Sequence, residues 1–497
     1  MSDNPHPIHL LVAGHTNVGK TSLLRTLGRS TGFGDVSPSP STTRQIVPIE
    51  LIRTETLTLT AYDSPGLENA GRLLEQLDDQ TKNSRDQSQA IRDLLATPSA
   101  REDFEQECRV LAQALKSNAC LAVLDAREPV LEKYLDELLL LARCGRPLLP
   151  VLNFTVSQES LEQEWRERLA TIGQHVVIAF DAVVYSMESE RRLYRGLATV
   201  LPDAESSLET LIQQRESDSD WRLEAATHAL SEGLIEIAAC QELAPANQPR
   251  ALASAVDRLT RYVEVRERRM TKEILEAFNY APDILGNALH PDYTDTGRWS
   301  LPPFSREAAR YYGIRATGPI GAGAVVGSTL DIATGGTLLG AGTATGALAG
   351  GLISAHRALL RAGRKLLRQQ ETVAPNDTVL NLIATRNLQL ITSLQSRGHA
   401  STKLLNLPQP GKWTALGDSL PTPLRRAREM PAWSDYQSTA ETLTNQNKQP
   451  SSGIAVAMQS ARLASRDQAR EHAIARLKEH LLDTMESQAG AGSTAGR

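Results

Sequence analysis

The sequence has few aromatic residues and few cysteines. Its 497 residues include 6 Phe, 5 Trp and 10 Tyr, which leaves few anchors for a single large core. At roughly 150 residues per domain, the length predicts two to four domains. The four cysteines, Cys108, Cys120, Cys144 and Cys240, form no CxxC pair, which argues against a disulfide framework and against a zinc site. A reducing cytoplasm is the expected compartment.

An excess of positive charge and an export signal are also missing. The chain has 53 Lys and Arg against 58 Asp and Glu, a net charge of -5. This balance argues against a globally basic nucleic-acid binder and against an acidic disordered chain. The opening MSDNPHPIHLLVAG begins with an acid and two prolines, and its apolar run ends in a glycine motif, so no export signal is expected.

Short apolar runs typical of buried strands recur over the first 183 residues. They occupy residues 8–13, 46–52, 57–62, 119–124, 147–152 and 176–180. Helical patterns between most of them predict a parallel α/β sheet of six strands. The second and third runs are joined by only four residues, 53–56, which predicts an antiparallel hairpin and therefore one reversed edge strand.

The rest of the chain has mainly helical patterns. A long polar connection predicts a helical insertion at about 68–118, and helical spacing over 205–212, 220–240, 251–278 and 379–394 predicts a mainly helical C-terminal region. The expected layout is a nucleotide-binding domain at 1–200, a helical domain at 201–316, a glycine-rich apolar segment at 317–355, a helical region at 356–440, a polar linker at 441–452, a terminal helix at 453–486 and a disordered tail at 487–497.

A phosphate-binding motif follows the first predicted strand. GHTNVGKT, from Gly14 to Thr21, matches GxxxxGK[ST] with a strand before it and a helix after it. Gly14 and Gly19 let the backbone curl, so that its N–H groups point at phosphate oxygens near a helix N-terminus. Lys20 is expected to bridge the β and γ phosphates, and the Thr21 hydroxyl suits Mg²⁺.

Two further segments complete the pattern of a nucleotide switch. Asp63-Ser-Pro-Gly66 follows the third strand about forty residues after the phosphate loop, where an acid could hold the metal through water and Gly66 could sense the γ phosphate. Ser41-Thr42-Thr43-Arg44 lies just ahead of the second strand, and Thr43 is the preferred second hydroxyl for Mg²⁺. Taken alone, each segment also suits an ordinary turn or a solvated loop.

GHTNVGKTSLL, STTR and YDSPGLE together resemble the small bacterial P-loop GTPases of the TrmE/Era-like branch. The resemblance covers roughly residues 8–183 and implies a Ras-like sheet, Mg²⁺ and bound GTP or GDP. VLDAREPVLEKY, CGRPLLPVLNF and the helical C-terminal region resemble a bacterial set of GTPases that carry a C-terminal domain of unknown function. The resemblance implies that the nucleotide is bound by Gly14, Asn17, Val18, Gly19, Lys20, Thr21, Ser22, Asp63, Gly66 and Asn153. It implies catalytic roles for Lys20, Thr43 and Asn17. The implied metal ligands are Thr21, Thr43 and Asp63.

The chain departs from the pattern of these relatives at the guanine motif. They use N/T-K-x-D, but this chain has Asn153-Phe-Thr-Val156, so the Lys and the base-binding Asp are missing. Asp181 could compensate, although a role in a turn is the stronger expectation. GTP is therefore implied by the resemblance, and an ATPase stays an alternative.

Two other positions bear on hydrolysis. The residue after the DxxG motif is Leu67, where Ras-like proteins have a Gln that orients water, so slow intrinsic hydrolysis is expected. Asn17 matches the asparagine that coordinates a potassium ion in TrmE-like enzymes. It is equally suited to a turn that needs its backbone shape.

The glycine-rich segment has no Lys or Arg and a single acid, Asp331. Its glycines recur at four-residue spacing: Gly323/Gly327, Gly336/Gly340 and Gly342/Gly346/Gly350. On helices this spacing forms a flat face that allows close contact in lipid, as in a membrane hairpin. Some form of membrane contact is slightly favoured over a soluble hairpin. The next residues put Arg357, Arg361, Arg364, Lys365 and Arg368 on one helical face opposite leucines, a pattern that suits anionic lipid headgroups.

The sequence therefore predicts a cytoplasmic GTP-binding switch protein, peripheral at the inner face of the membrane. Its GTPase domain would act on a helical effector region that contacts the membrane or a membrane protein, and a nucleotide-dependent homodimer is a further expected partner. The rival hypothesis is a membrane-interaction or assembly protein whose nucleotide site is only structural. Nucleic acid is not expected as a partner, because the C-terminal half shows no basic GXXG loop.

Overall fold

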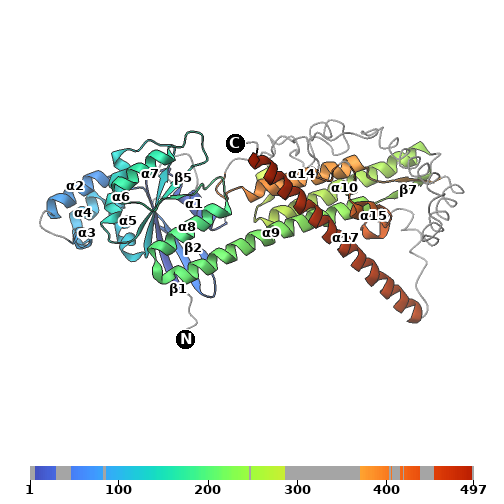
Figure 1. The fold of residues 1–497 in the computed structure, drawn as a ribbon, viewed down its shortest axis with the longest axis horizontal. Coiled ribbons are helices and arrows are strands. Elements are labelled where there is room, and N and C mark those ends of the chain that lie inside the picture. The colour runs from blue at the N-terminus through green and yellow to red at the C-terminus, as the bar shows by residue number, and fades with distance from the viewer. Residues whose placement is uncertain are drawn as a thin grey trace. The chain divides into compact units, whose positions relative to one another are not determined.

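A computed structural model of the chain describes residues 6–29, 46–81, 86–245, 248–285, 370–401, 405, 415–417, 419–436 and 453–494. The chain forms two compact units, drawn in Figure 1. The first unit comprises residues 1–221 together with 395–403, and the second comprises 222–394 and 404–497. The first unit therefore includes a short segment from the C-terminal half of the chain.

The first unit is built on a six-stranded sheet with the order β2-β3-β1-β4-β5-β6. Only β2 runs antiparallel to its neighbour, and its register with β3 shifts between Glu50 and Ile52. The predicted Ras-like α/β fold, with one reversed edge strand, is thus confirmed. The strands are β1 (His6–Ala13), β2 (Val47–Arg53), β3 (Leu57–Asp63), β4 (Ala119–Asp125), β5 (Leu148–Asn153) and β6 (Ile178–Ala179).

Helices cover both faces of this sheet, so its central strands are buried on both sides. Every residue of β4 is buried, as expected for a strand of a parallel sheet between two helical layers. One apolar core joins the sheet to α1, α8 and the start of α9 (Glu205–Ala239). A second core joins it to α6, α7 and the helices between residues 70 and 116. The helices outside the insertion are α1 (Lys20–Leu27), α6 (Glu132–Ala142), α7 (Glu162–Thr171) and α8 (Met187–Val200).

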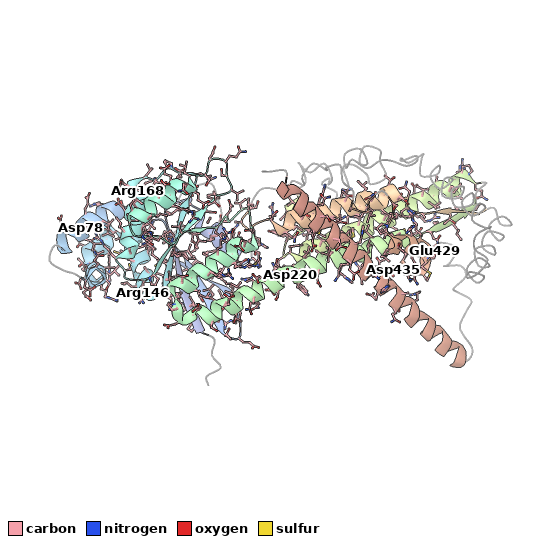
Figure 2. The ribbon with its side chains drawn as sticks, in the orientation of Figure 1. Asp78, Arg146, Arg168, Asp220, Glu429 and Asp435 are labelled. Carbon is pink, nitrogen blue, oxygen red and sulfur yellow. The ribbon has the colours of Figure 1, made fainter. Side chains whose placement is uncertain are left out.

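Between β3 and β4 the chain forms the helical insertion that the sequence suggests. It contains α2 (Ala70–Thr81), α3 (Gln87–Ala96), α4 (Pro98–Asp103) and α5 (Glu105–Lys116). Asp86 caps α3 by accepting a 3.0 Å hydrogen bond from the Gln89 amide. Asp78, labelled in Figure 2, lies on α2. Its exposed carboxylate pairs with Arg143.

One long helix replaces two predicted helices at the start of the C-terminal region. The sequence patterns suggest separate helices at 205–212 and 220–240, whereas α9 is continuous over Glu205–Ala239. No Gly or Pro interrupts the polar stretch between the two patterns, so the helix continues through it. The two compact units divide at Trp221, within α9, rather than near residue 200.

The second unit is mainly helical, with a two-stranded antiparallel sheet that the sequence patterns do not predict. In that sheet β7 (Glu242–Pro245) pairs with β8 (Gln370–Val373). The further helices are α10 (Pro249–Ala277), α14 (Asp377–Gln395), α15 (Thr422–Arg428) and α17 (Gly453–Thr494). Their core contains a buried charge cluster, in which Glu236 contacts both Arg266 and Arg470.

Several predicted segments lie outside the described residues. They are residues 317–355, the basic stretch 356–369, the linker 441–452 and the switch segment 41–44. At the C-terminal end, α17 runs to Thr494, so the helix extends into the tail predicted to be disordered. No helix in the described part of the chain is long and apolar enough to cross a membrane.

Candidate nucleotide-binding site

The candidate site lies where four neighbouring strands end. β1, β3, β4 and β5 are parallel and end on the same edge of the sheet, so the residues at their carboxyl ends are brought together. β1 lies between β3 and β4, and the chain crosses from one side of β1 to the other after β3. Ligands of open α/β sheets bind at such a reversal of strand order.

The loop between β1 and α1 has the backbone shape of a phosphate cradle. Gly14 and Gly19 have φ values of 137° and 94°, and Asn17 has φ 66°. A β-carbon on Gly19 would lie 2.2 Å from the side-chain nitrogen of Asn153, so only glycine fits this close approach. Asn17 is exposed, and its positive φ is a backbone shape that asparagine adopts in turns, the alternative role considered for this residue. Val18 is buried in the core behind the loop.

Lys20 is the first residue of α1 and is 7% exposed. Its ammonium group donates hydrogen bonds to the carbonyl oxygens of Gly14 (2.9 Å) and His15 (2.8 Å). Burial lowers the pKa of Lys20, and the negative charge of Asp63 is the strongest influence in the opposite direction. The lysine is therefore held over the loop, where its charge would meet phosphate oxygens.

Thr21 and Asp63 meet at the expected metal position. The Thr21 hydroxyl donates a 2.6 Å hydrogen bond to Oδ2 of Asp63, which is 2% exposed at the end of β3. A hydroxyl and a carboxylate are hard oxygen ligands, and Mg²⁺ in nucleotide sites takes few protein ligands because phosphate oxygens and waters complete its shell. These residues fit Mg²⁺. Ser22 follows half-buried on α1, and Thr43 lies outside the described residues.

The DxxG motif approaches the phosphate loop from the other side. A β-carbon on Gly66 would lie 2.7 Å from the hydroxyl of Thr16, and the Gly66 carbonyl accepts a hydrogen bond from Gln106 in the helical insertion. Leu67 is 1% exposed and packs in the core, so it cannot orient water. The next residue, Glu68, accepts a 3.1 Å hydrogen bond from Thr16.

A second pair of residues joins the phosphate loop to α6. Nδ1 of His15 lies 2.6 Å from Oε1 of Glu137, and Nε2 of His15 lies 3.4 Å from the ammonium of Lys133. Burial raises the pKa of Glu137, and its hydrogen bond with His15 opposes that shift. The sequence analysis missed this pair, because His15 is a variable position of the motif and Glu137 is 122 residues away.

Asn153 connects three parts of the site and is fully buried at the end of β5. Its amide nitrogen donates to the carbonyl oxygen of Val18 at 2.9 Å, and its Oδ1 accepts from the amides of Phe154 and Ala182, each at 2.9 Å. The predicted site residue therefore lies beside the phosphate loop. Its side chain contacts backbone groups, so it positions loops around the site.

Phe154 and Val156 stand in the place of the Lys and the Asp of the guanine motif. Phe154 has φ 59°, and the guanidinium of Arg127 lies 3.9 Å from its ring centroid. Asp125 at the end of β4 holds Arg127 through bonds of 2.9 and 2.7 Å. Val156 is 63% exposed where relatives carry the base-binding Asp.

Asp181 follows β6 and is 6% exposed. Its Oδ1 accepts hydrogen bonds from the amides of Val183 and Val184 at 2.9 Å, and its Oδ2 lies 3.4 Å from the amide of Val156. The carboxylate thus stabilises the turn after β6, as a turn residue would, and also contacts the loop that follows Asn153.

Two protein families match the chain. The family described as 50S ribosome-binding GTPase matches residues 9–153, and the family of the domain of unknown function DUF3482 matches residues 166–456. The second match covers more than half of the chain. No curated protein matches the chain.

Solved structures of nucleotide-binding proteins resemble about a third of the chain. Era from Aquifex aeolicus, bound to GDP and AlF4⁻, is 15% identical with a TM-score of 0.26, and the match covers 35% of this chain and 51% of that chain. The G domain of the FeoB iron transporter from T. maritima is 19% identical with a TM-score of 0.22, covering 36% and 89%. This chain spans about half the length of the Era chain that it matches.

The family matches agree with the strand order, the phosphate loop and the contact between Thr21 and Asp63. Since the DUF3482 match covers more than half of the sequence, the chain belongs to the DUF3482 family, and it carries a P-loop GTPase domain ahead of the DUF3482 region.

Proposed function

We propose that the first unit binds Mg²⁺ with GTP or GDP and hydrolyses GTP slowly, as a member of the TrmE/Era-like branch. The observation that carries this proposal is the 2.6 Å contact between the Thr21 hydroxyl and Asp63 beside a phosphate loop that holds Lys20. A hydroxyl at the start of α1 and a carboxylate at the end of the adjacent strand form the metal side of such a site. The lysine and the loop amides form its phosphate side.

Each residue of the site then has a defined role. The backbone amides from Gly14 to Gly19 would hold the phosphates, and Lys20 would neutralise the β and γ phosphates. Thr21, Asp63 and Thr43 would hold Mg²⁺, directly or through water; when bound, the ion neutralises charge on the phosphate oxygens. The Gly66 amide, close to Thr16, would sense the γ phosphate.

Hydrolysis would be slow because the position that orients water in Ras-like proteins is occupied by Leu67, which is buried in the core. Asn17 is exposed at the rim of the phosphate loop, where it could help to bind potassium. The rate would then be higher in potassium than in sodium. A nucleotide-dependent homodimer is a second proposed route to activation.

The nucleotide state would control the helical DUF3482 region. The glycine-rich segment and the basic stretch that follows it support an effector that contacts a membrane surface or a membrane protein, with the chain peripheral at the inner face. Ribosome binding, which the description of the GTPase family mentions, is a weaker proposal because the chain has a net charge of -5.

A phosphate-release assay with GTP and Mg²⁺ tests the proposal. The Asp63→Asn variant keeps the shape of the side chain and removes its charge, so we expect hydrolysis to fall by at least about tenfold. An Asp103→Asn variant, changed at the exposed end of α4, should retain the wild-type rate. No release by the wild-type protein in potassium, or an unchanged rate in Asp63→Asn, would contradict the proposal.

An ATPase is the second candidate. The specific observation is that Phe154 and the exposed Val156 stand where a Lys and an Asp would recognise guanine. Competition between GTP and ATP for the same site separates the two candidates. Displacement of bound GTP by an equal concentration of ATP would favour the ATPase.

A further inference from the structure

A short segment from the C-terminal half of the chain completes the first unit. α14 ends at Gln395, and residues 396–401, here called the strap, pack within the first unit rather than the second. The strap lies beside residues 181–185, which connect β6 to α8. These residues are here called the base-side loop, because Asp181 and Ala182 contact Val156 and Asn153, the two ends of the segment in the place of the guanine motif. The sequence gives no local sign of this contact, since more than 200 residues separate the two segments.

Backbone hydrogen bonds join the strap to the base-side loop. The Gly398 amide donates to the carbonyl oxygen of Val183 at 2.9 Å, and the Tyr185 amide donates to the carbonyl oxygen of Ser396 at 3.0 Å. Between them, Val184 and Arg397 form an antiparallel bridge. The strap therefore gives the base-side loop a backbone partner through one isolated bridge and its two flanking hydrogen bonds.

The strap also contacts α1, the helix that begins with Lys20. The hydroxyl of Thr26, a residue that is 1% exposed, donates to the carbonyl oxygen of Ala182 at 2.7 Å and accepts from the Ala400 amide at 3.4 Å. One buried hydroxyl thus joins α1, the base-side loop and the strap. Such a group is costly to leave without partners.

The contact has no room for a side chain at residue 398. A β-carbon on Gly398 would lie 2.0 Å from the carbonyl oxygen of Ala182 and 3.1 Å from the hydroxyl of Thr26. Both neighbours are buried, and the closer one is backbone, so any larger residue must move the strap or the loop.

The base-side loop is in turn connected to the phosphate loop. The Ala182 amide donates to Oδ1 of Asn153, and the amide nitrogen of Asn153 donates to the carbonyl oxygen of Val18. A continuous series of hydrogen bonds therefore runs from the strap through the base-side loop to the phosphate loop. Within this series the strap itself contacts α1 and the base-side loop.

We propose that the strap is a positioning element of the nucleotide site, supplied by the DUF3482 region. This inference rests on the proposed function. The strap holds the base-side loop in the shape that receives a nucleoside, so that the loop need not be ordered at the moment of binding. Gly398 and Thr26 are its positioning residues. The groups that would hold the phosphates belong to residues 14–20, which the strap reaches only through Ala182 and Asn153.

Calorimetry on the full chain tests this inference with two ligands, GDP and tripolyphosphate, each with Mg²⁺. Tripolyphosphate has the phosphates but no nucleoside. Gly398→Val displaces the strap, and Thr26→Val keeps the side-chain shape while removing the hydroxyl. We expect each variant to bind GDP about tenfold more weakly, because one or two positioning hydrogen bonds are lost. The affinity of each variant for tripolyphosphate should stay within about twofold of wild type.

Thr199→Val is the matched control, because it removes an exposed helix hydroxyl that bonds to the Arg195 carbonyl on α8. Hydrogen exchange without nucleotide provides a second readout: the amides of residues 182–185 should exchange faster in Gly398→Val, while those of β1 should not. Equal losses for both ligands would indicate a merely structural role and overturn the inference, as would unchanged GDP affinity. If wild-type protein binds neither ligand, the proposed function fails and the inference fails with it.

Discussion

The side-chain nitrogen of Asn153 lies 2.9 Å from the carbonyl oxygen of Val18. Because the same side chain accepts hydrogen bonds from the amides of Phe154 and Ala182, one fully buried residue joins the end of β5, the phosphate loop and the base-side loop. In this chain the first residue of the degenerate guanine motif therefore has a positioning role that does not require the rest of the motif.

Replacing Asn153 by alanine tests that role. The change leaves the Val18 carbonyl and two amides without their partner, and each unsatisfied buried group costs about 1–3 kcal/mol. We expect a loss of about 2–4 kcal/mol in the free energy of unfolding, together with weaker nucleotide binding. Denaturant unfolding measures the first effect and calorimetry the second. Asn118→Ala, which removes a single bond to the His9 amide, should lower stability without weakening binding.

The proposed metal site predicts a change in the Mg²⁺ requirement. Thr21→Val removes the hydroxyl that faces Asp63 and keeps the side-chain shape. We expect the Mg²⁺ concentration for half-maximal GTP hydrolysis to rise by at least about tenfold. Thr210→Val, an exposed change on α9, should leave it unchanged. An identical Mg²⁺ dependence in Thr21→Val and wild type would remove Thr21 from the metal site.

The contact between His15 and Glu137 predicts a pH dependence of stability. Burial raises the pKa of Glu137 above its ordinary value of 4.5. Between that value and the raised pKa, the carboxyl group is protonated in a larger fraction of folded than of unfolded molecules. The stability that this group contributes is present below 4.5 and is lost as the pH rises through the raised pKa. A glutamine does not titrate and keeps the shape of the side chain.

We therefore expect Glu137→Gln to gain stability relative to wild type as the pH rises from about 4 to about 7. Melting temperatures measured across this range test the sign. Glu164→Gln, on the exposed face of α7, controls for the loss of one carboxylate. A melting temperature of Glu137→Gln that falls relative to wild type as the pH rises would contradict this prediction.

The guanine motif can be rebuilt to test base recognition. Phe154→Lys combined with Val156→Asp restores N-K-x-D after β5. A hydrogen bond from a base edge to a carboxylate contributes about 1.5–3 kcal/mol to the free energy of binding, or roughly 10 to 100-fold in affinity. We expect the double variant to prefer GTP over ATP more strongly than wild type by about this factor. An unchanged ratio would show that the base lies elsewhere.

The parts of the candidate site whose position was predictable from sequence are local in the chain. Gly14 to Thr21 and Asp63 belong to short motifs at strand ends, and the alternation of strands and helices identifies the sheet that brings those ends together. The reversed edge strand was predictable for the same reason, because the connection between β2 and β3 is too short for a crossover.

The features that were missed depend on contacts between distant residues. β7 and β8 are four residues each and more than 120 residues apart, so neither has a hydrophobic pattern long enough to mark a strand. The contact of Gly398 with Val183 and that of His15 with Glu137 are likewise set by packing. A lone glycine or glutamate in a helical region gives no indication of such a partner.

Calorimetric titration of the full chain with GDP, GTP and ATP, each with Mg²⁺, tests the central claim most directly. Lys20→Ala removes the ammonium held over the phosphate loop, and Lys116→Ala, at the exposed end of α5, is the matched control. The account predicts that wild type and Lys116→Ala bind GDP and GTP in preference to ATP, and that Lys20→Ala binds neither guanine nucleotide. Equal binding in Lys20→Ala and wild type, or no nucleotide binding by wild type, would contradict it.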